Sequence, residues 1–275
     1  MSIKEKIDSR EKCLLNAKKI VIKVGTSTLI NEDGVVDFHR IKKIVEEICY
    51  LQDRGKNMVL VTSGAIGVGV LKMGLERKPK TICEKQAAAA IGQGILLRIY
   101  EKEFASYEKI IAQLLLTKND LEDRDKCIHA QNTFNELLKR GVIPIINEND
   151  AVAVEEIKFG DNDTLSALIA KAIGADLLIL LSDIDGLYSS DPRIDKNANM
   201  ISYVDAITED IEGCGSDSMG DLGTGGMCTK IKAAKIAVSS GVSMVIANGS
   251  RDNIIKDIVC CKEVGTLFAA SEACL

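Results

Sequence analysis

The sequence KIVIKVGTST occupies residues 19–28 and joins a short apolar run to a group of small residues. The run Lys19–Val24 is rich in β-branched side chains and predicts a buried β-strand, and the residues after it predict a tight turn. The same pattern recurs along the chain, where short β-branched runs alternate with longer stretches whose apolar residues have helical spacing. This alternation predicts a mostly parallel sheet whose strands are connected by crossover helices, with helices covering both faces.

The other expected strands are Met58–Thr62, Ile110–Leu116, Val142–Ile146, Leu177–Leu181, Met200–Val204, Ser243–Ala247 and Gly265–Ala269. The expected helices are His39–Asp53, Glu84–Phe104, Asp125–Lys139, Thr164–Ile173, Lys230–Ser239 and Asn253–Lys262. The segment Ala151–Phe159 follows a strand directly and predicts a hairpin at the edge of the sheet. No linker rich in Pro, Ser or Gly divides the chain, so one domain is expected.

The composition is that of an ordinary soluble globular protein, with 46% hydrophobic and 27% charged residues in a chain of 275. The net charge of -5 gives no general attraction to nucleic acid or to an anionic membrane. Residues 1–13 are charged throughout and lack the apolar core of a secretory signal, and the longest apolar runs are far shorter than the ~18 residues of a membrane helix. We therefore expect a cytoplasmic protein with no nucleic-acid partner and no membrane partner.

The nine cysteines are scattered and form no CxxC pair, which favours reduced thiols over a disulfide framework. His39 and His129 are the only histidines in the chain, so few residues could form a Cys/His zinc site. We assign no transition-metal site.

Polar and small residues gather just after the expected strands, which is where ligands bind in a doubly wound sheet. Lys23–Thr28 and Thr62–Gly69 each allow backbone N–H groups to approach an anion closely, although two tight turns would account for the same residues. Lys23 stands at the end of an apolar strand, where a lysine either extends outward to water or faces a bound anion. Neither GxxxxGK[ST] nor GxGxxG opening a helix is present, which excludes a P-loop or Rossmann site.

Two acidic and amide-rich segments follow the fourth expected strand: NEND at residues 147–150 and GDNDT at residues 160–164. Helix capping would account for Asp163, but it does not account for Asn147 and Asp150. These two residues are therefore candidates for ligand binding.

The segment Ser182–Arg193 follows the most apolar strand and reads either as a turn-rich loop or as part of a ligand site. The glycine-rich stretch Gly213–Gly226 predicts a functional loop, and it leads to Lys230 in the first turn of the next expected helix. The helix dipole disfavours a cation in that turn, so Lys230 needs another reason to be there. A bound phosphate supplies one.

Seven segments resemble, in the same order along the chain, those of the glutamate 5-kinases in the amino acid kinase family. They are KVGTSTL (23–29), TSGAIGVG (62–69), QAAAAIGQG (86–94), IPIINENDAV (143–152), FGDNDTLSA (159–167), SDIDGLYSSDPR (182–193) and GTGGMCTKIKAA (223–234). The resemblance runs from about Lys19 to Leu267. Aspartate kinases usually begin with a KFGGTS-like segment, which is absent here. Acetylglutamate and UMP kinases share the fold but lack the pair NENDAV and FGDNDTLSA.

The resemblance implies an α/β fold, a three-layer α/β/α sandwich with a mainly parallel sheet of about eight strands. It implies a single amino acid kinase domain over residues 1–275, in which the N-terminal half binds glutamate and the C-terminal half binds ATP. Many members of the family continue into a PUA domain of the RNA-modification type. This sequence ends about where that domain would start, so we expect a form without it.

The activity implied is the ATP-dependent phosphorylation of the side-chain carboxylate of L-glutamate to L-glutamyl 5-phosphate, the first step of proline biosynthesis, with Mg²⁺. By resemblance, glutamate is contacted by Ser63, Asp150 and Asn162, with Asn147 close by. The residues implied for ATP are Lys23, Ser182, Asp183, Thr224, Gly225, Gly226, Met227, Cys228, Thr229 and Lys230. Lys23 and Lys230 would flank the transferring phosphoryl group, with Asp163 holding both lysines.

The residue types suit this chemistry. A glutamate side chain has a pKa near ~4.3, so it is an ionised nucleophile at neutral pH and needs no general base. Phosphoryl transfer needs in-line positioning and positive charge on the transferring oxygens, which two lysines and Mg²⁺ provide. Asp150 would supply the complementary charge for the α-ammonium group.

The resemblance also implies a homo-oligomer, feedback inhibition by proline, and hand-off of the product to glutamyl phosphate reductase. Another kinase of the family, similar to acetylglutamate or UMP kinases, is the alternative activity. A non-catalytic amino-acid sensor on the same fold would be expected to lose a catalytic lysine, but both Lys23 and Lys230 are present. An RNA-binding module is disfavoured by the acidic charge.

Overall fold

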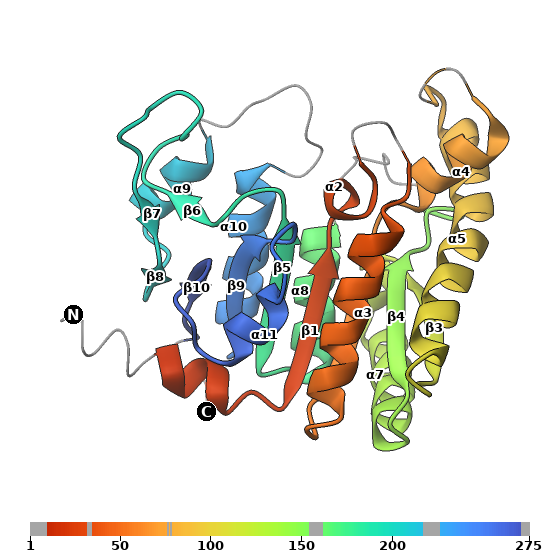
Figure 1. Ribbon diagram of the computed structural model, residues 1–275, viewed down its shortest axis with the longest axis horizontal. Helices are drawn as coiled ribbons and strands as arrows, with labels where there is room; N and C mark the ends of the chain where they lie inside the picture. The colour runs from red at the N-terminus through yellow and green to blue at the C-terminus, as the bar shows by residue number, and fades with distance from the viewer. Residues whose placement is uncertain are drawn as a thin grey trace.

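The computed structural model describes residues 10–31, 35–75, 77, 79–153, 162–216 and 226–270. Within these residues, eight strands form one sheet in the order β3-β4-β2-β1-β5-β9-β10-β8 (Figure 1). The strands are β1 (Lys19–Val24), β2 (Asn57–Val61), β3 (Ile111–Leu116), β4 (Ile143–Glu148), β5 (Leu177–Ser182), β8 (Tyr203–Val204), β9 (Ser243–Asn248) and β10 (Thr266–Phe268). Neighbouring strands are parallel except β9 and β10, which are antiparallel.

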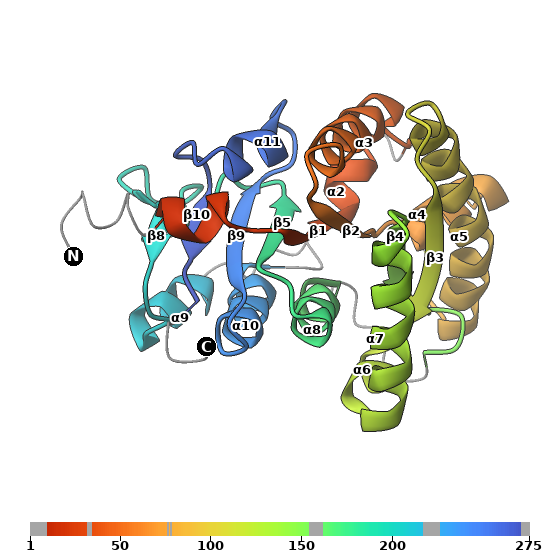
Figure 2. The ribbon, with the colours of Figure 1, turned by 90° about the horizontal axis from the view of Figure 1, so that it is seen from below.

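Helices cover both faces of the sheet (Figure 2). One layer contains α3 (Phe38–Gln52), α5 (Ile82–Ala105) and α11 (Ile254–Val259). The other contains α7 (Arg124–Lys139), α8 (Asn162–Ile173) and α10 (Met227–Val238). The shorter helices are α2 (Thr26–Leu29), α4 (Ala65–Met73), α6 (Lys118–Glu122) and α9 (Glu209–Ser216), and residues 10–15 are also helical. The predicted α/β/α sandwich with a mainly parallel sheet of about eight strands is confirmed.

The alternation of side chains along β1 sends its residues into two separate cores. Ile20, Ile22 and Val24 pack in the core beneath α3, α5 and α11, whereas Val21 packs in the core beneath α8 and α10. Successive side chains of a strand point to opposite faces, so Lys23 shares the face of Val21. The strand therefore directs this lysine toward α8 and α10.

The expected strand Met200–Val204 is divided in the structure. Met200–Ile201 forms β7, which pairs with β6 (Leu187–Tyr188) in a separate antiparallel pair, while Tyr203–Val204 forms β8 of the main sheet. Ser202 lies between them, and its carbonyl accepts hydrogen bonds from Leu267 N and Arg10 Nη1. The apolar pattern predicted extended backbone correctly, but it carried no signal that the two ends have different partners.

The glycine-rich loop expected at Gly213–Gly226 lies largely outside the described residues, which omit 217–225. Gly213 was expected in a loop and lies within α9 instead. The hairpin expected at Ala151–Phe159 lies largely outside the described residues, and the described part, residues 151–153, begins with a turn. Within the part of the chain that the structure describes, no helix is long and apolar enough to cross a membrane.

Candidate active site

The carboxyl end of β1 lies at the point where the order of the sheet reverses. From β1 the chain passes to β2 on one side and fills the edge with β3 and β4, then returns to place β5 on the other side of β1. Crevices at such switch points are the usual ligand sites of open α/β sheets. The ends of β1 and β5 approach closely at Gly25, whose N–H donates to Leu181 O at 3.2 Å and where an added Cβ atom would lie 3.3 Å from the same oxygen.

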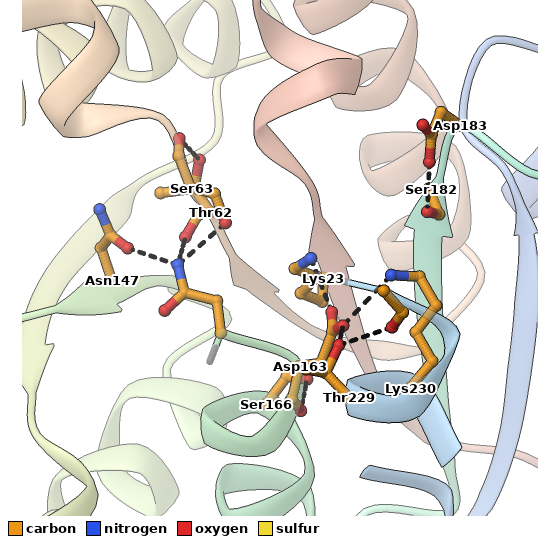
Figure 3. A network of polar contacts seen from close by, with 12 residues as sticks. Lys23, Thr62, Ser63, Asn147, Asp163, Ser166, Ser182, Asp183, Thr229 and Lys230 are labelled. Carbon is orange, nitrogen blue, oxygen red and sulfur yellow. Dashed lines mark hydrogen bonds and ion pairs between the residues drawn. The ribbon is translucent and has the colours of Figure 1, made fainter. Parts of the chain in front are cut away.

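Three charged side chains meet at this end of β1 (Figure 3). Lys23 Nζ lies 2.7 Å from Asp163 Oδ1, and Lys230 Nζ lies 3.3 Å from Asp163 Oδ2. Thr229 Oγ1 donates to Asp163 Oδ2 at 2.8 Å. The structure thus brings together Lys23, Lys230 and Asp163, which the sequence predicted as the catalytic group.

Burial controls the charges in this group. The side chain of Asp163 is 0% exposed, and burial alone would raise its pKa, but the charges of Lys23 and Lys230 hold the pKa below its ordinary value. Burial also lowers the pKa of Lys230, while the carboxylate of Asp163 opposes that shift. Asp163 is therefore a permanent carboxylate at neutral pH, and it keeps two buried ammonium groups in one place.

Local sequence explains how α8 and α10 present these groups. Asp163 lies in the first turn of α8, where the helix dipole favours a carboxylate. Gly226 is the N-cap of α10 and makes no side-chain cap, and Lys230 follows in the first turn, where the dipole disfavours a cation. Asp163 lies opposite that turn and offsets the disfavoured charge.

A second polar group lies beside the first, around the amide of Asn162. Asn162 Nδ2 lies 3.0 Å from Thr62 O, 2.9 Å from Ser63 Oγ and 3.0 Å from Asn147 Oδ1. The three acceptors come from the ends of β2 and β4, which are adjacent strands. The structure therefore gathers Ser63, Asn147 and Asn162, three of the four residues predicted to bind the amino acid.

Asn162 and Asp163 are neighbours at the start of α8, yet their side chains belong to different groups. Asn162 contacts the ends of β2 and β4, whereas Asp163 contacts the lysines of β1 and α10. One helix start therefore links the two groups. A ligand held by the first group would have the lysines of the second next to it.

The fourth residue predicted to bind the amino acid, Asp150, is half-buried in the turn after β4. Burial raises the pKa of its carboxyl group to about 6. No ion pair to Asp150 occurs among the described residues. A partly desolvated carboxylate of this kind is suited to binding a cation.

The turn that follows Ser63 depends on Gly64. This glycine has a positive φ of 91° and forms the N-cap of α4. Only glycine adopts this left-handed conformation without strain. The turn places Ser63 at the end of β2 and starts α4 immediately after it. The small residues after β2 therefore build a sharp strand-to-helix turn at the site.

The predicted nucleotide residues are placed in part. Ser182 is buried at the end of β5 and donates to the exposed carboxylate of Asp183, with Oγ 2.9 Å from Oδ1. Met227 and Cys228 occupy the first turn of α10, after the N-cap Gly226. Thr224 and Gly225 lie outside the described residues.

Two features of this region were missed in the sequence. Asn248 ends β9, and its Nδ2 donates to Asp185 Oδ1 at 3.1 Å, so it lies beside the loop after β5. The rule that ligands bind beyond strand ends, if applied to Ser243–Asn248, would have found it. Tyr100 of α5, which contacts Thr62, had no signal in the sequence beyond an apolar helical position.

The fold and the arrangement of these polar groups define a class of protein. The model of the amino acid kinase family matches residues 18–248, and the chain belongs to this family. Two solved structures have the same fold. UMP kinase from Bacillus anthracis has a TM-score of 0.62 and 17% identity over 93% of this chain and 97% of that chain. UMP kinase from Ureaplasma parvum has a TM-score of 0.64 and 16% identity over 92% of this chain and 99% of that chain.

Among curated proteins, the chain is similar to glutamate 5-kinases. It is 57% identical to that of Clostridium tetani over 95% of this chain and 98% of the relative, and 53% identical to that of Clostridium acetobutylicum over the same shares. It is also 53% identical to that of Caldanaerobacter subterraneus over 91% of this chain and 67% of the relative. The predicted resemblance is therefore confirmed.

Proposed function

We propose that this chain transfers the terminal phosphoryl group of ATP to the side-chain carboxylate of L-glutamate, giving L-glutamyl 5-phosphate in the first step of proline biosynthesis. The observation that carries the proposal is the placement of Asn162 and Asp163, whose side chains join an amide-rich group to a group of two buried lysines. The names of relatives up to 57% identical over 95% of this chain support the same substrate and reaction.

In the proposed reaction, a carboxylate oxygen of glutamate attacks the γ-phosphorus of ATP. The bond from the γ-phosphorus to the β–γ bridging oxygen breaks, and ADP leaves with the electron pair of that bond. The attacking carboxylate is already ionised, so no proton has to be removed. Lys23 and Lys230 stabilise the charge that builds on the transferring oxygens, and Asp163 keeps both lysines oriented.

Glutamate recognition is assigned to the residues around the amide of Asn162. The carboxylate of Asp150 pairs with the α-ammonium group of glutamate. Its half-buried position, which raises its pKa in the free protein, supports this role. Ser63, Asn147 and Asn162 contribute hydroxyl and amide groups, which bind carboxylate and ammonium groups without adding net charge. The N-terminal half of the domain is thereby assigned to glutamate.

ATP is assigned to the C-terminal half of the domain. Ser182 ends β5 and Asp183 follows it, and α10 begins after its N-cap Gly226, at a helix start of the kind that favours phosphate. Mg²⁺ would enter with the phosphates of ATP, since this ion keeps several waters and is often held by substrate phosphates. When bound, it neutralises charge on the β- and γ-phosphate oxygens. Among the described residues, no group of three His, Cys, Asp or Glu side chains offers a protein-only metal site.

A hydroxamate assay tests the proposal. The purified protein is incubated with ATP, Mg²⁺ and hydroxylamine, which converts an acyl phosphate into a coloured hydroxamate. L-glutamate should give colour and equimolar ADP, while L-aspartate, N-acetylglutamate and UMP should not. Colour with aspartate but not glutamate would overturn the substrate assignment. ADP formed with UMP or N-acetylglutamate alone would favour the alternative kinases of the family.

Regulation and assembly are proposed on the resemblance. Proline competes with glutamate at or beside the group around Asn162, the chain forms a homo-oligomer, and the labile product passes to glutamyl phosphate reductase. Saturating glutamate should relieve inhibition by proline. Inhibition that glutamate leaves unchanged would place proline elsewhere.

A further inference from the structure

Tyr100 lies on α5, and its side chain is fully buried. Its hydroxyl oxygen lies 2.9 Å from Thr62 Oγ1. Burial raises the pKa of the phenol well above its ordinary range, so the hydroxyl keeps its proton at any working pH. Thr62 Oγ1 also donates to Ser63 O at 3.4 Å, so loss of the Tyr100 hydroxyl would leave the Thr62 hydroxyl with this longer and weaker bond alone.

Thr62 connects Tyr100 to the proposed glutamate site. Its carbonyl accepts from Asn162 Nδ2 at 3.0 Å, and its N–H donates to Ile146 O at 2.8 Å. The next residue is Ser63, whose Oγ lies 2.9 Å from the same amide nitrogen. A movement of Thr62 would therefore move two of the three acceptors around Asn162.

Packing leaves room beside Thr62. A cavity of ≈ 10 Å³ lies there, and its lining includes Thr62, Tyr100, Gln93, Leu96 and Asn147. This volume is about that of one water molecule. No side chain fills this space, so the orientation of the Thr62 side chain depends on its two hydrogen bonds, of which the bond to Tyr100 is the shorter.

The same helix reaches the other strand of the site. Gln93 Nε2 of α5 donates to Glu148 O at the end of β4, at 3.2 Å. The two bonds from α5, one to Thr62 and one to Glu148, hold the ends of β2 and β4. These strand ends carry Ser63 and Asn147.

We propose that Tyr100 is a positioning residue for the amino acid substrate, acting through Thr62 on Ser63 and Asn162. The inference rests on the proposed function, because the site in question is the one assigned to glutamate. Tyr100 is fully buried, and Thr62 connects its hydroxyl to the amide of Asn162. It belongs to none of the segments that carry the family resemblance.

The test is the variant Tyr100→Phe, measured by steady-state kinetics with each substrate varied in turn. Loss of a hydrogen bond of ordinary net strength corresponds to about a 2–10-fold change in an equilibrium constant. We expect the KM for glutamate to rise by about that factor, with kcat and the KM for ATP changed by less than about twofold. In thermal melts, glutamate should raise the melting temperature of Tyr100→Phe less than that of the wild type, whereas ATP should raise both equally.

Two controls separate positioning from general loosening. Tyr107→Phe removes the same atom from a tyrosine just beyond α5 and outside the site, and it should leave all constants unchanged. Thr62→Val should reproduce the rise in KM for glutamate, and Thr62→Ser, which keeps a hydroxyl, should recover most of it. The double variant Tyr100→Phe/Thr62→Val should be no worse than Thr62→Val alone, because Thr62→Val already removes the bond that Tyr100→Phe removes.

The outcomes distinguish this inference from the proposed function. A wild-type protein that forms no hydroxamate from glutamate removes the proposed function, whatever Tyr100 does. With an active wild type, a folded Tyr100→Phe variant of unchanged KM for glutamate overturns the positioning role, and so does an equal rise in both KM values. If Tyr100→Phe melts below the assay temperature, Thr62→Val against Thr62→Ser gives the same measurement.

Discussion

At the scale of single residues, Lys23, Lys230 and Asp163 bring together two positively charged side chains and one negatively charged side chain. Two buried ammonium groups surround one carboxylate, so the trio carries an excess positive charge without ATP. The phosphates of ATP would balance that charge. Replacing a lysine and replacing the aspartate should therefore have opposite effects on the free protein.

We expect Lys230→Met to fold with an unchanged or higher melting temperature, because the remaining Lys23–Asp163 pair is neutral. Its kcat should fall by roughly 10²–10³, the scale for one charge stabiliser. Asp163→Asn removes the carboxylate that both buried lysines share and should lose about 3–5 kcal/mol of stability. Thermal melts with and without ATP check this, since ATP should rescue Asp163→Asn in part. Normal turnover in folded Lys230→Met would remove that lysine from the reaction.

Asp150 gives a pH dependence with a defined sign. Burial raises its pKa to about 6, so below that pH the carboxyl group is protonated and cannot pair with the α-ammonium group of glutamate. The kcat/KM for glutamate should fall as the pH drops through about 6, by up to tenfold per unit. Asp150→Asn should raise the KM for glutamate strongly and abolish the fall of kcat/KM below about pH 6. It should also reduce the preference for glutamate over glutarate.

The same raised pKa predicts the effect on stability. In the unfolded chain the pKa of an aspartate is about 3.9, so the folded state binds the proton more tightly and loses stability as the pH rises between about 4 and 6. Asp150→Asn should therefore stabilise the free protein at pH 7.5, by about 1 kcal/mol after allowance for its partial exposure. A variant that melts lower and keeps the original substrate ratio would show that Asp150 only supports its turn.

At the scale of elements, the close contact of α4 with α5 positions the turn that carries Ser63, a residue of the proposed glutamate site. A Cβ atom added at Gly92 of α5 would lie 1.8 Å from Ala65 O, at the start of α4. A Cβ atom at Gly69 of α4 would lie 1.8 Å from Ala88 O. Since α4 follows Ser63 and Gly64 directly, any displacement of α4 moves the turn at the end of β2.

Gly92→Ala should consequently destabilise the protein by about 1–3 kcal/mol or more, the scale of overpacking, and raise the KM for glutamate. Gly94→Ala is a matched control on the same helix, because a Cβ there meets nothing within 4 Å. It should stabilise the protein by up to about 1 kcal/mol through helix propensity. Urea unfolding of both variants checks the pair, and equal stabilities would contradict the tight helix contact.

At the scale of the whole molecule, the sheet order assigns the two proposed substrates to opposite sides of β1. The ends of β2 and β4 lie on one side, the ends of β5 and β9 lie on the other, and α8 contributes to both. Hydrogen exchange measures this division. Glutamate should slow exchange in residues 62–69 and 143–150, and a non-hydrolysable ATP analogue should slow it in residues 182–188 and 226–235. Protection of residues 182–188 by glutamate alone would contradict the assignment of the halves.

Local pattern was sufficient for most elements. The strand Lys19–Val24 was predicted with its observed limits, and the helix expected at Thr164–Ile173 is α8, because burial imposes a periodicity that is readable over a few residues. The residues themselves indicated Asn147, Asp150 and Lys230 as candidates, because helix capping and turn geometry did not account for them, whereas Ser63, Asn162 and the role of Asp163 came from the family resemblance.

Other features exist only in the folded chain. The sequence places Lys23 and Lys230 far apart, and only the central position of β1 and the packing of α8 and α10 bring both to Asp163. The division of the segment 200–204 between two sheets and the bond between Tyr100 and Thr62 are likewise products of packing. Periodicity fixes the face on which a side chain lies, because that depends on its neighbours in sequence. Which side chains then meet depends on strand order and crossovers, which are set by contacts between distant segments.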